Sequence, residues 1–83
     1  MKILYFAWLR ERLNKNEEDV VLPADVETVG DLIAWLAARD ETAELAFANP
    51  RIIRAALDTD IVDHATPLGS ARTVALFPPM TGG

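Results

Sequence analysis

One long amphipathic segment constrains the fold of this chain more than any other feature of its sequence. The spacing of apolar residues predicts a helix over 28–39, with one apolar stripe along it. The stripe is formed by Val29, Leu32, Ile33 and Leu36. Thr28 is a good N-cap residue, and Asp31 three positions later resembles the second half of a capping box. One such helix can cover one face of a sheet. In a chain of only 83 residues, it therefore predicts a single small α+β domain.

Short segments rich in β-branched and aromatic residues flank this helix on both sides. They predict strands over 2–8, 18–22, 51–57, 61–62 and 73–77, with short helical stretches over 9–13 and 43–47. This order suits the ubiquitin-like β-grasp, a mixed sheet whose first and last strands are parallel and central, with one main helix packed on one face. We therefore expect a β-grasp domain over 1–79, followed by a flexible C-terminal Gly-Gly tail over 80–83.

Charge and composition exclude several classes of function. The sequence contains 8 Lys and Arg residues but 13 Asp and Glu residues. This excess of negative charge argues against nucleic-acid binding as the main activity. The absence of Cys excludes a disulfide scaffold, a cysteine nucleophile and a thiolate zinc site. His64 stands in no nucleophile motif, and the acidic residues of 58–63 lack the glycine and glutamate of a calcium loop. We therefore expect no metal and no self-sufficient active site.

The N-terminus argues against export or membrane insertion. The apolar run 3–9 is interrupted at once by Arg10, and no small-residue cleavage site follows it. This run is too short to span a membrane and makes a poor signal peptide. We therefore expect a cytoplasmic protein.

The first predicted strand is apolar on both of its alternating sets. If the helix covers the set with Ile3 and Tyr5, then Leu4 and Phe6 lie on an uncovered face. A contiguous exposed apolar patch commonly marks a partner surface. The alternative is that loops and the short helix at 43–47 cover this face.

The C-terminal segment is the sharper signal of function. Pro78 and Pro79 fix their own φ angles and hold the preceding residue extended, so the chain should project stiffly from the sheet after Phe77. Gly82 and Gly83 have no Cβ atoms and can enter a channel too narrow for a side chain. The alternative is a frayed terminus without a role.

These residues resemble a known family. The segment 75–83, Ala-Leu-Phe-Pro-Pro-Met-Thr-Gly-Gly, closely resembles the tail of molybdopterin synthase small subunits, the MoaD branch of the MoaD/ThiS sulfur carriers. The segment 3–11 resembles the family's first strand, which runs into Phe-Ala-x-x-Arg-Glu, and 28–32 resembles its helix start. The chain departs from the family at Asp58, where Asn is common, and at 70–72, where Gly-Asp-Glu is usual.

The resemblance implies a carrier whose chemistry lies on its main-chain terminus. An ATP-using, ubiquitin-activating-like adenylyltransferase adenylates the carboxylate of Gly83, and sulfur then converts it to a thiocarboxylate. The tail inserts into the large synthase subunit and gives its sulfur to cyclic pyranopterin monophosphate. The resemblance assigns threading of the tail to Pro78, Pro79, Met80, Thr81 and Gly82. It also assigns partner contacts to Phe77 and Ile61. We expect Phe6 and Leu4, on the uncovered face, to contribute to the same partner surface.

The family further implies a non-catalytic subunit with no bound cofactor, in a dimer of heterodimers whose active site lies on the large subunit. Three alternatives remain at this point. The chain could carry sulfur for thiamine or tRNA thiolation, it could be a ubiquitin-like modifier joined to lysines, or it could be an inert binding module. The Phe-Pro-Pro approach to the tail and the chain length favour the molybdopterin branch.

Overall fold

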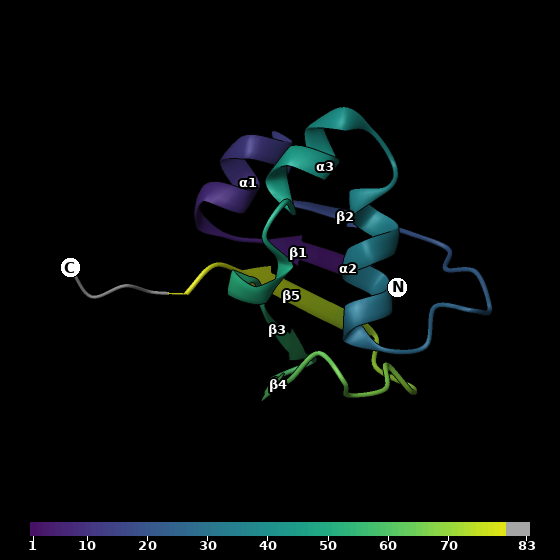
Figure 1. Ribbon diagram of the computed structural model, residues 1–83. Helices are drawn as coiled ribbons and strands as arrows, with labels where there is room; N and C mark the ends of the chain where they lie inside the picture. Colours follow the sequence, from purple (N-terminus) through teal and green to yellow (C-terminus); the bar gives the residue numbers. More distant parts are fainter. Residues whose placement is uncertain (80–83) are drawn as a thin grey trace.

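The structure, a computed structural model, describes residues 1–79, in which five strands form one mixed sheet (Figure 1). The elements in chain order are β1 (Lys2–Tyr5), α1 (Ala7–Leu13), β2 (Glu17–Asp19), α2 (Val29–Ala37), α3 (Glu41–Ala46), the 3-10 helix η1 (Pro50–Ile52), β3 (Arg54–Leu57), β4 (Asp60–Val62) and β5 (Thr73–Phe77). The tail predicted over 80–83 lies outside the described residues. None of the helices in the described part is long and apolar enough to cross a membrane.

The strand order in the sheet is β2-β1-β5-β3-β4. The first and last strands, β1 and β5, are parallel neighbours, whereas the other pairs are antiparallel. This is the expected β-grasp arrangement. It places β5 between β1 and β3, which pair with the backbone N–H and C=O groups on both of its edges.

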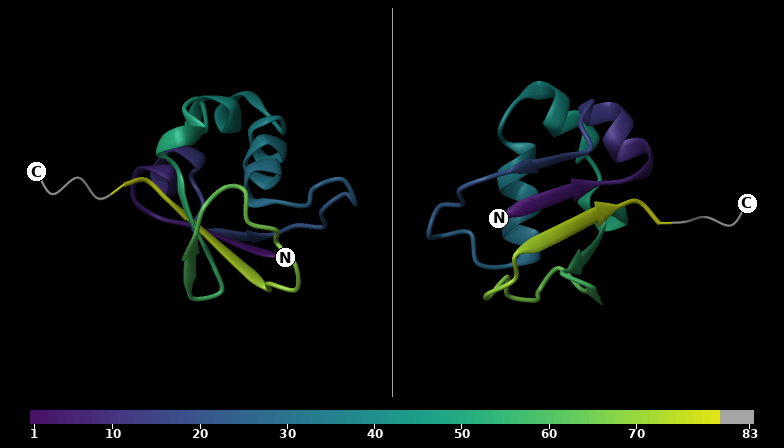
Figure 2. Two further views of the ribbon diagram at one scale, coloured as in Figure 1. Left: turned by 60° about the horizontal axis from the view of Figure 1, so that its bottom comes forward. Right: turned by 180° about the vertical axis from the view of Figure 1, so that it is seen from behind.

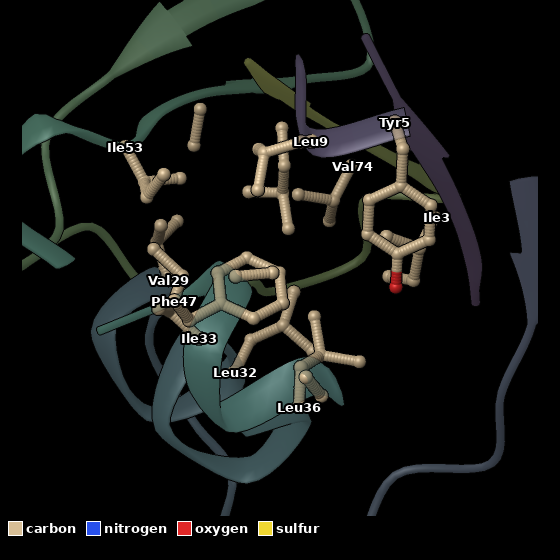
Figure 3. Packing of buried hydrophobic residues seen from close by; sticks show 14 of the residues in the cluster. Ile3, Tyr5, Leu9, Val29, Leu32, Ile33, Leu36, Phe47, Ile53 and Val74 are labelled. Carbon is tan, nitrogen blue, oxygen red and sulfur yellow. The ribbon is translucent and has the colours of Figure 1, made fainter. Parts of the chain in front are cut away.

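Within residues 1–79, all three α-helices lie on the same side of the sheet, so no helix covers the other face, which we call the bare face (Figure 2). The core forms between the sheet and α2, whose four stripe residues point at the strands (Figure 3). The largest fully buried side chains are Ile3, Leu9, Val29, Leu32, Ile33, Leu36, Ile53, Val74 and Leu76. With no disulfide to assist it, the domain depends on this core for its stability.

The start of α2 is fixed by the capping box that the sequence predicted. Thr28 Oγ1 accepts a hydrogen bond from the Asp31 N–H at 3.1 Å, and Asp31 Oδ2 accepts one from the Thr28 N–H at 3.1 Å. Hydrogen bonds from the backbone N–H groups of Glu27 and Thr28 lower the pKa of Asp31. The ionised carboxylate lies in the first helical turn, where the helix dipole favours it.

The predicted first strand, 2–8, is too long. The strand β1 ends at Tyr5, and Ala7 already begins α1, because the chain turns at Ala7 with a φ of +55°. Trp8, which we expected in the strand, therefore lies on the helix and packs against the core.

Two other predicted strands are also misplaced. The second strand covers Glu17–Asp19 rather than 18–22. The segment predicted as a strand from 51 begins as η1, since Pro50 suits the first position of a helix, and β3 starts only at Arg54. The last strand, 73–77, has the predicted bounds.

Asp58 joins the turn after β3 to the beginning of β5. It adopts a φ of +54°, and its Oδ1 accepts hydrogen bonds from the N–H groups of Arg72 (3.1 Å) and Thr73 (3.2 Å). Asn tolerates the same left-handed conformation and offers the same acceptor oxygen. The departure from the usual Asn at this position therefore preserves the local geometry.

We expect Asp58→Ala to lower the free energy of unfolding by about 2 kcal/mol. Two hydrogen bonds are lost at about 1 kcal/mol each, and alanine tolerates a positive φ poorly. The melting temperature should fall by roughly 10 °C, given 4–8 °C per kcal/mol in a domain of this size. Asp58→Asn is the matched control and should change stability by less than about 0.5 kcal/mol in a urea titration. An equal loss in both variants would show that the charge matters rather than the geometry.

Candidate functional site

The bare face of the sheet carries a row of directly paired apolar residues. Strand register aligns Leu4 with Ala75, Ala75 with Ala56, and Ala56 with Ile61 across four strands. Paired residues in neighbouring strands point to the same face of a sheet. Because Ile3 and Tyr5 point into the core, this row points away from the helices. We call this surface, with Phe6 and Phe77, the outer face.

The four partner-contact residues expected from the sequence all lie on the outer face. Ile61 is 74% exposed and Phe6 is 44% exposed, while Leu4 and Phe77 are half-buried. The alternative was that loops and the helix at 43–47 cover this face; the helix does not, because α3 packs against α1 and α2 on the other side. The right-hand view of Figure 2 shows the bare face of the sheet.

Phe6 reaches the outer face although it lies beyond the end of β1. Its backbone is extended, and its N–H donates a hydrogen bond to the Leu76 carbonyl at 3.2 Å, which prolongs the pairing of β1 with β5 by one residue. The positive φ of Ala7 then turns the chain into α1 immediately after Phe6. The aromatic ring therefore lies at the end of the sheet where β5 also finishes.

Charged residues border this apolar surface. Arg54 is paired directly with Phe77, and an ion pair of 3.2 Å joins Lys2 to Glu17 at the β1–β2 end. An apolar centre with a polar rim is the usual anatomy of a protein–protein interface. Sequence reasoning missed Arg54, which only the strand register places beside Phe77.

The C-terminal segment leaves the fold one residue later than the sequence suggested. The strand β5 ends at Phe77, but Pro78 is still buried and Pro79 is half-buried. The expected projection therefore cannot begin before Pro79. The other predicted tail residues, Met80, Thr81, Gly82 and Gly83, lie outside the described residues.

The outer face offers contact area rather than reactive groups. Its residues are mainly Leu, Ala, Ile and Phe, which hold no nucleophile and no acid–base pair. His64, the single histidine of the sequence, lies elsewhere, with its Nε2 at 2.6 Å from the Ile53 carbonyl, so it has a structural partner. The geometry thus favours docking on the outer face.

Comparison with known proteins shows the family of the chain. The model of the ThiS family matches residues 3–83, which is nearly the whole chain. The chain belongs to the ThiS family. Its resemblance to the MoaD/ThiS sulfur carriers, inferred from the tail and the first strand, is confirmed.

A curated relative of this ThiS-family chain is the molybdopterin synthase sulfur carrier subunit of Escherichia coli K12. The two are 35% identical over 83 residues, which is all of this chain and 99% of the relative. The crystal structure of SAMP1 from Haloferax volcanii matches with a TM-score of 0.73 and 24% identity, over 100% of this chain and 98% of that one. At this identity the likeness shows the fold, which is the ubiquitin-like β-grasp.

The two neighbouring residues at the end of β5 should respond differently to truncation. Leu76 is fully buried, so Leu76→Ala should lower the free energy of unfolding by about 2–5 kcal/mol. Phe77 is half-buried on the outer face, so Phe77→Ala should cost about 1 kcal/mol or less and leave the circular dichroism spectrum unchanged. Urea unfolding of both variants measures the difference. A larger loss for Phe77→Ala would mean that the two faces of β5 are inverted.

Proposed function

We propose that this chain is the sulfur-carrier subunit of a molybdopterin synthase. The observation that carries the proposal is its likeness to a carrier subunit of that enzyme over the full length of both chains. The Phe-Pro-Pro-Met-Thr-Gly-Gly ending of the sequence supports it. The chain would work in the cytoplasm with a large catalytic subunit, two of each in a heterotetramer.

The reactive group of this carrier is the main-chain carboxylate of Gly83. A free carboxylate is a poor electrophile, so an adenylyltransferase first activates it. A carboxylate oxygen attacks the α-phosphate of ATP and pyrophosphate leaves. Hydrosulfide released by a sulfur donor then attacks the acyl carbon, AMP leaves and a proton is lost, which gives a thiocarboxylate on Gly83. The tail delivers this sulfur to cyclic pyranopterin monophosphate in the active site of the large subunit.

The outer face explains how such a tail could be delivered. Phe6 and Phe77 lie at the end of the sheet where the chain leaves, so a partner docked there also faces the start of the tail. Four residues follow Pro79, and a fully extended chain spans at most about 3.3–3.6 Å per residue. The terminal carboxylate can therefore reach about 14 Å from Pro79. Gly82, with no Cβ, suits a narrow channel over this distance.

The domain itself supplies no catalytic residue under this proposal. The sequence contains no Cys, so the sulfur has no side chain on which to reside. This matches a carrier whose cargo is held on the backbone terminus. ATP is consumed by the activating enzyme, and the carrier binds no cofactor of its own.

The deciding experiment is the intact mass of the protein after co-expression with its activating enzyme. We expect a mass gain equal to the exchange of one oxygen for sulfur, which is lost when Gly83 is deleted or when residues are added after it. Both variants should retain the circular dichroism spectrum and the melting temperature. A tagged, unprocessed protein that still supports synthesis would refute a terminal thiocarboxylate. The mass of a whole attached protein would instead indicate a modifier, and no change of mass an inert module.

Docking to the large subunit should depend on Phe77. Interface free energy concentrates in a few aromatic and aliphatic side chains, each worth roughly 2 kcal/mol or more. Phe77→Ala should therefore raise the Kd for the large subunit at least tenfold, since about 1.4 kcal/mol corresponds to a factor of ten. Thr73→Ala, at the other end of the same strand and on the same face, is the control and should change the Kd less than twofold. Unchanged affinity in the Phe77→Ala variant would remove the outer face from the docking model.

A further inference from the structure

A second concave surface lies on the helix side of the molecule, away from the outer face. One cavity of about 380 Å³ opens where α1 and α2 end beside β2, and another of about 410 Å³ opens at α3. Both cavities are lined by Arg12 and Thr42, so they adjoin. Figure 1 shows α1 and α3 side by side at the top of the molecule. We call the two cavities together the α1–α3 groove.

One end of this groove is cationic, although the chain as a whole carries a formal charge of -5. Arg12, Lys15 and Arg39 line it, three of the eight Lys and Arg residues in the sequence. Two carboxylates, Glu18 and Asp40, line it as well. The groove is therefore locally positive on an acidic protein.

Both carboxylates are already engaged within the protein. Glu18 accepts hydrogen bonds from the Tyr5 hydroxyl at 2.7 Å and from Arg39 Nη1 at 2.8 Å. Asp40 caps α3 by accepting a hydrogen bond from the Ala43 N–H at 2.7 Å. Partial burial raises the pKa of Glu18, but the hydrogen bonds from Tyr5 and Arg39 outweigh it and lower the pKa overall. Burial and the bond to Glu18 raise the pKa of Tyr5, so the phenol remains a donor.

The guanidinium of Arg12 remains available to a ligand. It stacks on the Trp8 ring at 4.7 Å from the centroid, and within residues 1–79 it forms no ion pair. Stacking occupies the flat face of a guanidinium and leaves its N–H edge for a carboxylate. Lys15 lies 3.6 Å from Glu18, a loose contact that a second carboxylate can share.

The other end of the groove is apolar. Leu45 lines it on α3 and is 71% exposed, and the buried Ala46 lies beside it. Glu41 and Glu44 of the same helix line neither cavity. The groove thus offers an apolar contact and a carboxylate site within one continuous surface.

We propose that the α1–α3 groove binds an acidic peptide segment of a partner protein. Carboxylates of the segment pair with Arg12 and Lys15, and one apolar side chain packs on Leu45. A small inorganic anion would use only the cationic end. Nucleic acid and anionic lipid surfaces need a broad cationic face, whereas the three cations of this groove suit a short acidic segment. The groove uses no residue of the outer face, so both surfaces can be occupied at once.

The test is a titration with the acetylated, amidated peptide Glu-Asp-Leu-Glu-Asp. The chain has two tryptophans, and each lies under an arginine of the groove: Trp8 under Arg12, and Trp35 under Arg39 at 5.3 Å. Intrinsic fluorescence therefore reports on the site, and amide NMR shifts should map to α1 and α3. We expect saturable binding that weakens at least tenfold in the Arg12→Glu variant and at least threefold in the Leu45→Ser variant.

The matched control is Arg72→Glu, the same substitution at an exposed arginine outside the groove, which should change the Kd less than twofold. Arg12→Gln, which removes the charge without reversing it, should weaken binding several-fold, and thermal melts confirm that each variant is folded. The peptide Gln-Asn-Leu-Gln-Asn should not bind.

Three results would overturn the proposal: no shifts at millimolar peptide, equal weakening by Arg72→Glu, or an equal midpoint with inorganic phosphate alone. None of them bears on the thiocarboxylate, because the measurement uses neither the tail nor the outer face.

Discussion

The parallel pairing of β1 with β5 is the contact on which the rest of the structure depends. It joins the first residues of the chain to the last strand, and it lies at the centre of the sheet. The pairing buries Ile3 and Val74 against α2, and by alternation it turns Leu4 and Phe77 outward. Because side chains alternate with a period of two, a slip of one residue would exchange the core with the outer face. One register therefore sets both the stability of the domain and the surface it can offer to a partner.

The parts of the fold that sequence reasoning predicted well are those with a local cause. The start of α2 follows from an apolar stripe and a capping box, although the helix ends at Ala37 rather than at the predicted Arg39, and β5 ends where two prolines begin. The end of β1 has no such local sign. The turn depends on a positive φ at Ala7, which alanine adopts only when the surrounding packing requires it. Composition also gave no reason to separate η1 from β3, because the segment 52–57, apolar except for Arg54, suits either element.

The same distinction applies to the surfaces. The Gly-Gly ending with its Pro-Pro approach is contiguous in sequence, so it could be read as a functional signal without a structure. The outer face could be predicted only in part: the family resemblance indicated Ile61, but Arg54 joins the face only through strand register. The α1–α3 groove could not be predicted, since its residues come from five elements and from turns. Arg12 and Leu45 are far apart in the sequence, and only the packing of α1 on α3 brings them to one groove.

The proposed function, with sulfur held on the main-chain terminus, would place an unusual demand on the fold. No side chain has to be activated, so the domain contributes the direction and the origin of the tail. The structure meets this demand by ending its central strand at the site of departure: β5 is hydrogen-bonded to β1 on one side and to β3 on the other, and Pro78 is buried immediately beyond it. The origin of the tail is thereby held by the most extensively paired strand of the sheet. A partner that binds the outer face at Phe6 and Phe77 would contact the same end of β5. Under the proposed function, the reach of Gly83 into the partner would be limited by the four residues beyond Pro79.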